Sequence, residues 1–376
     1  MFVKKIIFID NTAHHVYGQL HLMKYFLQLG YEVIVAIPMD SLFVDKLKHE
    51  DIKILNFNVD SKSINPLKDC VLFLRYLKLF YSVKPELICS FTIKPNLYGS
   101  LAAKFLGLPI VANVTGLGYV FIRDSFVSKV ALKLYRFCFK FTDFIFCQNH
   151  DDLEALIKHR ILSNKNKVGL LPGSGVNLKK FPYVGIHSSG NIQFMYSGRL
   201  LWDKGIRELI SAFRIVRQKY PFTKLIFIGN YFPSNPAAIS PEIIQGWQKE
   251  GLIEYKGMVD NVFDVMKDID CVILPSYREG MPRSLLEASS IGKPIITVDS
   301  VGCKDVVEDG ITGYMAKVAD VETLVIAMSK FIELPFDKKL EMGKNGRAKM
   351  EREFDQQIVI DKYVQVVNNL LGRLVD

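Results

Sequence analysis

The stretch that decides the fold reads CVILPSYREGMPRSLLEA, from Cys271 to Ala288. It begins with a short apolar run, passes through a polar turn, and continues with apolar residues at helical spacing. Because Pro282 suits the first turn of a helix, the stretch predicts a buried strand, a turn and a helix in succession. Glu279 falls in the turn, and Glu287 falls more than one helical turn further along.

The same alternation of strands and helices extends along the whole chain, which predicts parallel sheets covered by helices. In the first half we expect strands at 5–9, 32–37, 52–57, 87–90, 110–114 and 143–148, and helices at 19–30, 66–83, 96–107 and 126–141. In the second half we expect strands at 192–197, 224–229, 253–256, 270–275 and 294–299, and helices at 206–219, 261–267, 282–291 and 351–374.

A segment rich in Pro and Gly, LPGSGVNLKKFP at 171–182, interrupts the alternation. A chain of 376 residues is too long to fold around a single ordinary hydrophobic core. We therefore expect an α/β protein with two doubly wound, Rossmann-like domains at 1–180 and 181–354. A C-terminal helix at 355–376 is expected to pack back on the first domain. Two such domains would leave a cleft at the carboxyl ends of their strands, where these sheets bind ligands. One larger α/β domain is the alternative.

The net charge of +9 is concentrated in the first half of the chain. Residues 1–180 hold 24 Lys and Arg against 14 Asp and Glu, whereas the remainder holds 24 against 25. Such asymmetry can attract nucleic acid, an anionic membrane or a phosphorylated substrate. The six cysteines include no Cys-x-x-Cys pair, and the N-terminal apolar run is too short for a signal peptide. We therefore expect reduced thiols and a cytoplasmic protein.

Two cations lie five residues apart in the loop GRLLWDKG at 198–205, which follows an expected strand. Gly198 allows the backbone to turn, and Arg199 and Lys204 would then stand beside the N–H groups of a helix start. This arrangement suits a diphosphate. A capped loop with surface charges is the alternative.

The spacing of Glu279 and Glu287 and the basic loop together resemble the retaining glycosyltransferases of family 4, which have the GT-B fold and a Glu-x7-Glu signature. The segments LPGSGVN (171–177) and DGITGY (309–314) also resemble family segments. The resemblance implies that Glu279 contacts the donor sugar and Glu287 the nucleotide ribose. It further implies that Arg199 and Lys204 hold the diphosphate. The predicted donor site is completed by Gly198, Gly280, Met281 and Pro282.

Within the family, VTGLGYVF (114–121) and EGMPRSLLEA (279–288) look like segments of bacterial enzymes that build O-antigen, capsule or N-glycan precursors on undecaprenyl diphosphate. The resemblance implies transfer of a hexose or N-acetylhexosamine from a UDP-sugar to a polyprenyl-diphosphate-linked glycan. Among these sugars it favours N-acetylgalactosamine. It implies retention of configuration, with the departing diphosphate taking the acceptor proton, and no cofactor.

Two loops of the first domain are expected to face the acceptor: DNTAHHVYG at 10–18 and TIKPN at 92–96. Family members place acceptor or phosphate contacts in such loops. Many also carry His or Asp near the turn where this chain has Thr and Gly, so no general base is evident there. Adjacent histidines are also common as plain polar surface. The predicted acceptor-binding residues are His14, His15, Lys94, Asn96, Thr115 and Gly116.

The segment DID at 268–270 is similar to the Asp-x-Asp that holds a metal in other glycosyltransferases. Here it precedes a buried strand, which would point its carboxylates away from the ligand end of the sheet. The paired histidines lack a further ligand at a convincing interval. We therefore expect no catalytic metal.

Residues 67–84 and 126–147 interleave cations with aromatic side chains. Charges interrupt both stretches, so neither spans a bilayer. A basic, aromatic face predicts peripheral contact with an anionic membrane at the inner face of the plasma membrane, and with a polyprenyl chain. Ordinary helices packed on the sheet are the alternative.

Two other functions are consistent with such a chain. A nucleotide-sugar epimerase also uses two such domains, but it needs no basic, aromatic acceptor half and lacks Glu-x7-Glu in this setting. A non-catalytic binder of sugar nucleotides or nucleic acid is the second. The cations form no recognisable nucleic-acid motif, so we expect no nucleic-acid partner.

Overall fold

The computed structural model describes residues 4–39, 42–60, 63, 65–117, 126–162, 167–187, 190–233 and 235–372. The chain forms two compact units rather than one larger domain. The N-terminal unit comprises Met1–Ser174 and Gln356–Asp376, and the C-terminal unit comprises Gly175–Asp355. The first division therefore falls inside the Pro- and Gly-rich segment, a few residues before the boundary expected at 180.

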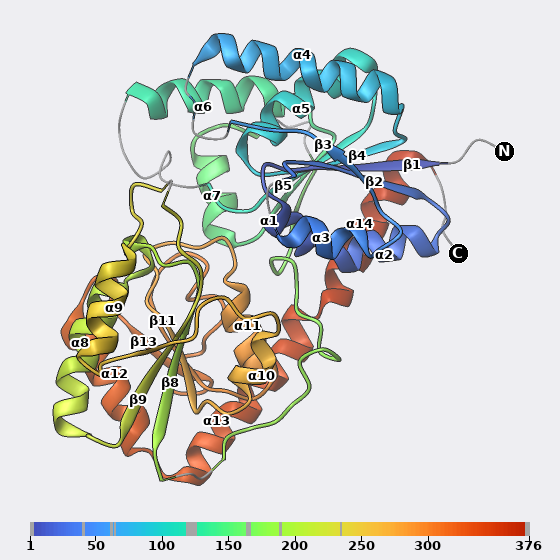
Figure 1. The fold of residues 1–376 in the computed structure, drawn as a ribbon. Helices are drawn as coiled ribbons and strands as arrows, with labels where there is room; N and C mark the ends of the chain where they lie inside the picture. The colour runs from blue at the N-terminus through green and yellow to red at the C-terminus, as the bar shows by residue number, and fades with distance from the viewer. Residues whose placement is uncertain are drawn as a thin grey trace. The chain divides into compact units, whose positions relative to one another are not determined.

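A parallel sheet of seven strands forms the centre of the N-terminal unit (Figure 1). Its order is β3-β2-β1-β4-β5-β6-β7, so the switch point of this doubly wound sheet lies between β1 and β4. The strands are β1 (Lys5–Ile9), β2 (Glu32–Ile37), β3 (Lys53–Asn56), β4 (Leu87–Phe91), β5 (Ile110–Val114), β6 (Phe144–Cys147) and β7 (Lys167–Leu170).

Helices cover both faces of this sheet because successive side chains of a strand point to opposite faces. Ile6 and Phe8 of β1 pack into one apolar core, whereas Ile7 and Ile9 pack into the other. The first core is closed by α1 (Ala13–Tyr17), α2 (Leu20–Gln28), α3 (Leu42–Lys48) and α14 (Gln356–Leu371). The second is closed by α4 (Pro66–Val83), α5 (Ile93–Leu106), α6 (Phe126–Phe139) and α7 (His150–Lys158).

The C-terminal helix α14 is part of the N-terminal unit. Its Tyr363 is fully buried and its hydroxyl accepts a hydrogen bond of 3.2 Å from the Asn113 side chain. The Lys362 ammonium donates to the carbonyl of Leu170 at 2.7 Å. A π-helical turn, Met350–Phe354, precedes α14 and ends the C-terminal unit, so the helix expected from residue 351 begins at Gln356.

A parallel sheet of six strands forms the centre of the C-terminal unit, in the order β10-β9-β8-β11-β12-β13. The strands are β8 (Ile192–Ser197), β9 (Thr223–Ile228), β10 (Glu254–Tyr255), β11 (Cys271–Leu274), β12 (Ile295–Val298) and β13 (Gly313–Ala316). The helices are α8 (Ile206–Lys219), α9 (Pro241–Lys249), α10 (Val262–Met266), α11 (Arg283–Ser290), α12 (Val321–Glu333) and α13 (Phe336–Lys349). Its switch point lies between β8 and β11.

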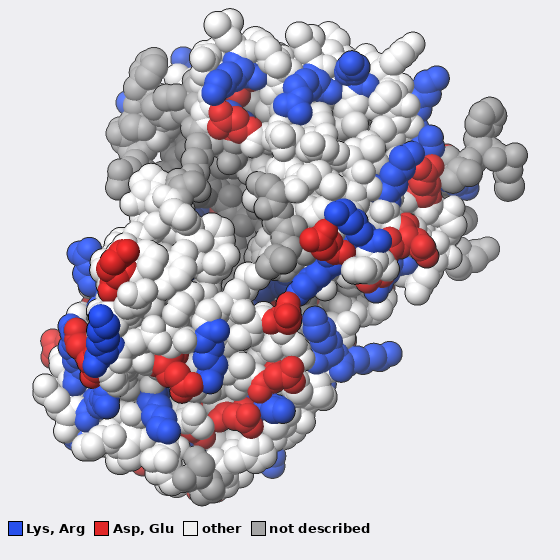
Figure 2. Space-filling model, viewed as in Figure 1, with Lys and Arg blue, Asp and Glu red and all other residues white. Residues whose placement is uncertain are grey.

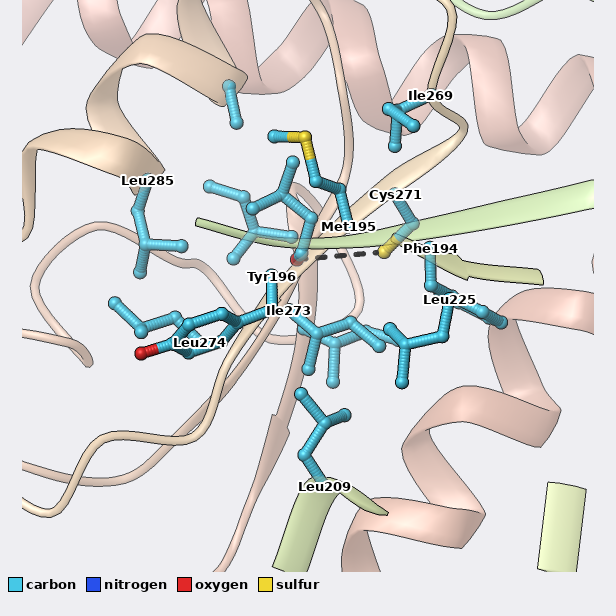
Figure 3. Close-up of a cluster of buried hydrophobic side chains, with 14 of the residues drawn as sticks. Phe194, Met195, Tyr196, Leu209, Leu225, Ile269, Cys271, Ile273, Leu274 and Leu285 are labelled. Carbon is cyan, nitrogen blue, oxygen red and sulfur yellow. Dashed lines mark hydrogen bonds between the residues drawn. The ribbon is translucent and has the colours of Figure 1, made fainter. Parts of the chain in front are cut away.

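The core of this unit is built from the two strands at the switch point and the helices that follow them. Figure 3 shows part of it, including Phe194 of β8, Ile273 of β11, Leu209 of α8 and Leu285 of α11. All four are almost fully buried. The loops after β8 and β11 therefore emerge from strands that are packed into the core.

Two acceptor loops expected from the sequence are partly helical in the structure. Residues 10–18 contain the short helix α1, which Thr12 caps by accepting a hydrogen bond from the His15 N–H. Helix α5 begins at Ile93, so Lys94 and Asn96 lie in its first turn. The sequence predicts that this helix begins only at Asn96, after Pro95. Proline is tolerated in the first turn because the first helical N–H groups have no partner in the helix, so α5 already begins before Pro95.

Some elements were not expected at all: α3, α7, β7, α9, β13, α12 and α13. Residues 118–121 of the segment VTGLGYVF lie outside the described residues. Within the described ranges, no helix is both long and apolar enough to cross a membrane.

Candidate active site

Three loops meet at the carboxyl ends of the strands beside the switch point of the C-terminal unit. The loop after β8 and the loop after β11 are joined by a hydrogen bond of 3.0 Å from the Tyr277 N–H to the carbonyl of Asp203. Gly205 has φ +70°, and a Cβ there would lie 2.0 Å from the carbonyl oxygen of Pro275. Only glycine allows the backbones of the two loops to come this close, so the loops pack directly against each other.

This junction brings Lys204 and Glu279 into direct contact. The Lys204 ammonium donates to Oε1 of Glu279 at 2.5 Å. Lys204 is only 7% exposed, and the Glu279 side chain is 17% exposed. Two residues that the sequence assigns to one ligand, 75 positions apart, therefore form a nearly buried ion pair.

The third loop, which follows β12, holds the backbone of Glu279. The Glu279 N–H donates to the carbonyl of Val301 at 2.9 Å. Gly302 has φ +80°, and a Cβ there would lie 2.6 Å from the carbonyl oxygens of Glu279 and Gly280. Sequence reasoning missed Gly302. The available signal was a glycine three residues after the end of the expected strand 294–299, at the same edge of the sheet as Glu279.

Arg199 lies in the same loop as Lys204 but is turned toward the neighbouring loop after β9. Its guanidinium lies 5.8 Å from the ring centre of Phe232, and its carbonyl accepts a hydrogen bond of 2.6 Å from the Tyr196 hydroxyl. Burial, and then the negative charge of Glu279, raise the pKa of Tyr196 well above its usual range. Gly198 precedes Arg199, and its N–H is bonded to the carbonyl of Ile228.

Glu287 lies on α11 and is also largely buried. Its carboxylate is 3.2 Å from the Arg283 guanidinium, one helical turn earlier. Burial raises the pKa of Glu287, while the charges of Arg283 and Lys180 oppose the shift. Pro282 is the residue before α11 rather than a member of its first turn.

The segment from Gly280 to Pro282 links the two carboxylates of the spacing motif. Met281 packs against the core of the C-terminal unit, and the carbonyl of Pro282 accepts hydrogen bonds from the first turn of α11. Glu279, Lys204 and the predicted donor residues Gly280 to Pro282 are thus gathered on adjoining loops, whereas Arg199 contacts neither carboxylate of the motif through a described bond.

The predicted acceptor residues of the N-terminal unit gather at the carboxyl ends of β1, β4 and β5. Thr115, Gly116 and Lys94 line a cavity of about 240 Å³ together with Asn11, Thr92 and Ile93. The Lys94 ammonium is bound to the Asp69 carboxylate at 2.6 Å, and both side chains are mostly buried. Its charge is therefore already compensated within the protein.

Asn96 is not among the residues that line this cavity, and it is 2% exposed. Its side-chain oxygen accepts from the Ser90 hydroxyl at 2.8 Å, and its side-chain nitrogen donates to the carbonyl of Asn113 at 2.9 Å. The Asn96 side chain thus ties α5 to β4 and β5.

The two adjacent histidines have different surroundings. The His14 ring packs edge-on against Phe43, with 4.7 Å between ring centres. Nδ1 of His15 is 2.7 Å from Oδ2 of Asp10, a fully buried carboxylate at the end of β1. Sequence reasoning treated Asp10 only as the start of a loop, although its place directly after the first strand was visible.

Among the described residues, no group of three or more His, Cys, Asp or Glu side chains could hold a metal ion. Asp270 lies at the amino end of β11, where its carboxylate accepts from the Gln193 N–H at 2.7 Å. The Asp-x-Asp segment thus serves the junction between α10 and β11.

Two family models match the chain, one on each unit. "Glycosyl transferase 4-like" matches residues 5–149, and "Glycosyl transferases group 1" matches residues 184–349. The chain is a glycosyltransferase of the GT-B fold. Matches on both units favour sugar transfer over the epimerase and binding-protein alternatives.

Two relatives of this glycosyltransferase are named for transfer to sugars on diphospho-undecaprenol. The chain is 27% identical over 358 residues to the N,N'-diacetylbacillosaminyl-diphospho-undecaprenol alpha-1,3-N-acetylgalactosaminyltransferase of Campylobacter jejuni, covering 90% of this chain and 92% of the relative. It is 25% identical to the UDP-Gal:alpha-D-GlcNAc-diphosphoundecaprenol alpha-1,3-galactosyltransferase of Escherichia coli, covering 82% of each. The crystal structure of Anabaena HepE with UDP and glucose superposes with a TM-score of 0.79, at 19% identity, covering 97% of this chain and 100% of that one.

Proposed function

We propose that this glycosyltransferase moves a hexose or N-acetylhexosamine from a UDP-sugar to an undecaprenyl-diphosphate-linked saccharide. N-acetylgalactosamine is the first candidate for the transferred sugar. The acceptor would belong to the assembly of a bacterial surface polysaccharide or a glycoprotein glycan. The relatives from Campylobacter jejuni and Escherichia coli, which act on diphospho-undecaprenol saccharides, support this acceptor class. The name of the second supports a UDP-sugar donor.

The observation that carries the donor assignment is the nearly buried pair of Lys204 and Glu279. A ligand that enters between them must give the ammonium an anion and the carboxylate hydrogen-bond donors, because a buried charge without a partner costs several kcal/mol. A sugar diphosphate has both groups in one molecule, with phosphate oxygens for Lys204 and sugar hydroxyls for Glu279. The partly buried Glu287 lies eight residues further along and suits the ribose hydroxyls.

The proposed chemistry is retaining and uses no metal. The charge that develops on the departing diphosphate falls near Lys204 and the amino terminus of α8, which begins directly after Gly205. Arg199 adds a second cation from the same loop. Groups that bind this charge more strongly in the transition state than in the bound donor accelerate the reaction. The departing phosphate takes the proton of the acceptor hydroxyl on the same face of the sugar.

The test is a transfer assay with UDP-GalNAc, UDP-GlcNAc, UDP-Gal and UDP-Glc, each with a polyprenyl-diphosphate-linked N-acetylhexosamine. We expect one or more donors to be used at an undiminished rate in excess EDTA. The anomeric proton coupling of the product should show an α linkage from the α-linked donor. A β linkage would overturn retention, and failure of all four sugars with a folded protein would overturn the donor class.

We further propose that the protein acts at the inner face of the membrane through the outer surface of α4, α5 and α6. These three helices contain eight Lys and Arg and one acidic residue, Asp69, which is paired with Lys94. Figure 2 shows more blue than red side chains over the top of the N-terminal unit. A surface so poor in acids attracts anionic lipid.

The same surface also exposes large apolar side chains. On α4, Leu67, Leu74 and Tyr81 follow one another at multiples of seven residues and are 76%, 59% and 70% exposed. This spacing places them in one stripe along the helix. Helix α5 adds the exposed Phe105, and α6 adds Phe137. Apolar side chains ringed by cations are typical of helices that lie in a membrane interface.

Replacing Leu67, Leu74 and Tyr81 together with serine is therefore expected to weaken binding to vesicles that contain anionic phosphatidylglycerol by about 10-fold or more. Flotation of the full chain with vesicles, without donor or acceptor, measures this. The matched control replaces Ile215, Ile243 and Ile326, exposed residues on helices of the C-terminal unit, and should bind as the unchanged protein does. Equal binding of the two triple variants would contradict the proposed surface.

A further inference from the structure

Asp10 is the centre of a network that the proposed chemistry does not yet use. Its carboxylate lies at the end of β1, beside the switch point, and has no exposed surface. Oδ1 accepts from the N–H groups of Asn11 and Thr12 at 2.6 and 3.3 Å, and it lies 3.4 Å from the Thr92 hydroxyl, which also donates to the carbonyl of Phe91 at 2.5 Å. Oδ2 faces Nδ1 of His15 at 2.7 Å.

The hydrogen-bonded neighbour of Oδ2 of Asp10 is the His15 ring. In the part of the chain that the structure describes, no Lys or Arg forms an ion pair with Asp10, whereas Nδ1 of His15 lies 2.7 Å from its Oδ2. A buried carboxylate without a counter-charge is costly, and the imidazolium of His15 can supply that counter-charge. In that form both ring nitrogens are donors, and Nδ1–H is used by Asp10.

The second ring nitrogen of His15 is left for a ligand. The His15 side chain is 30% exposed, and within the described ranges Nε2 forms no hydrogen bond to a protein group. The ring is also held in place by the edge of Phe91, 6.1 Å away between ring centres. An imidazolium fixed on one side therefore offers a single oriented N–H on the other.

The network also connects His15, through Asp10, to the wall of the candidate acceptor cavity. Asn11 and Thr92, which both bind Oδ1 of Asp10, line that cavity. Thr92 has φ +66°, which is rare for a β-branched residue. One carboxylate thus holds two residues of the cavity wall through one oxygen and His15 through the other. Lys94, the other cation predicted for the acceptor, is already neutralised by Asp69.

We propose that Asp10 is a positioning residue, which holds His15 as an imidazolium whose Nε2–H binds an oxygen of the acceptor diphosphate. The proposal rests on the proposed function, because it gives that acceptor its phosphate-binding cation. Charge-assisted hydrogen bonds of this kind change affinity by about 10-fold or more. Since Asp10 acts through His15, removing both groups should cost no more than removing His15 alone.

The experiment measures binding of farnesyl diphosphate, a short polyprenyl diphosphate, to the full chain by calorimetry. Asp10→Asn and His15→Gln should each weaken binding about 10-fold or more, and the double variant should match His15→Gln. Asparagine keeps the size of Asp10 and an oxygen for the N–H groups of Asn11 and Thr12, and a thermal unfolding curve checks that the fold is kept. Asp45→Asn removes the same charge from α3, where Asp45 pairs with Lys48, and should have no effect.

The outcomes separate this proposal from the donor chemistry. UDP affinity should be unchanged in Asp10→Asn, and a loss for UDP alone would overturn the assignment to the acceptor. Effects of the two single variants that multiply in the double variant would show that Asp10 acts independently of His15, which also overturns it. In the transfer assay, Asp10→Asn should raise KM for the acceptor with little change in kcat. Binding of farnesyl diphosphate without transfer from any UDP-sugar would count against the proposed function and leave this inference standing.

Discussion

Glu279→Ala is expected to lower kcat by about 10³-fold while leaving UDP bound at least as tightly as in the unchanged protein. The carboxylate is the group that we assign to the sugar hydroxyls, and removing one oriented group of this kind typically costs 10²- to 10³-fold. Its loss also releases the Lys204 ammonium, which is otherwise bound to Oε1 of Glu279 at 2.5 Å. The freed ammonium can then bind the diphosphate without first breaking a pair. Steady-state transfer at saturating donor and calorimetric titration with UDP measure the two effects.

Lys204→Met is the counterpart and should behave differently. It removes the cation assigned to the diphosphate, so UDP affinity should fall by about 10-fold or more. The Glu279 carboxylate would then lie beside an apolar side chain. A loss of UDP affinity in Lys204→Met without a loss in Glu279→Ala is what the proposed division of roles requires. Equal losses of UDP affinity would refute it.

The double variant of Glu279→Ala and Lys204→Met separates activity from stability. Each single change leaves one mostly buried charge without its partner, which typically costs about 3–5 kcal/mol of stability. The double change removes both charges, so the free energy of unfolding should return toward that of the unchanged protein while transfer stays lost. Transfer at the normal rate in Glu279→Ala would remove Glu279 from the site.

Much of this site could be predicted because its signals are local. The turn that holds Glu279 and the loop that holds Lys204 each follow an apolar run directly, and the carboxyl ends of parallel strands share one edge of a sheet. Strand and helix patterns depend on neighbouring residues. The strands and helices on either side of these two loops were therefore expected near their observed positions.

The parts that were missed depend on contacts between distant segments. Whether Lys94 is free or bound by Asp69, 25 positions earlier, is decided by how α4 packs on α5, and no local pattern records it. The burial of Asp10 likewise depends on the position of Thr92, which is 82 positions away. In both cases the role of a polar side chain is set by the residue with which it pairs, and not by its own residue type.

Gly302 is a third case, since only the folded chain shows what lies beside it. Its φ of +80° and the carbonyl oxygens of Glu279 and Gly280, 2.6 Å from an added Cβ, together exclude a side chain. Gly302→Ala is therefore expected to destabilise the protein by about 2–4 kcal/mol, from backbone strain and overpacking together. It should also lower kcat by about 10²-fold, because the turn that carries Glu279 must move and small displacements of a reacting group are costly.

Gly310→Ala is the matched control for this prediction. Gly310 lies in the same unit with φ +76°, but an added Cβ would meet nothing within 4 Å. It should show the cost of the backbone conformation alone, about 1 kcal/mol, with kcat within about twofold of normal. Denaturant unfolding and steady-state transfer compare the two variants. If Gly302→Ala were no worse than Gly310→Ala in both, the loop after β12 would not hold Glu279 in place, and the hydrogen bond from the Glu279 N–H to Val301 would be incidental to catalysis.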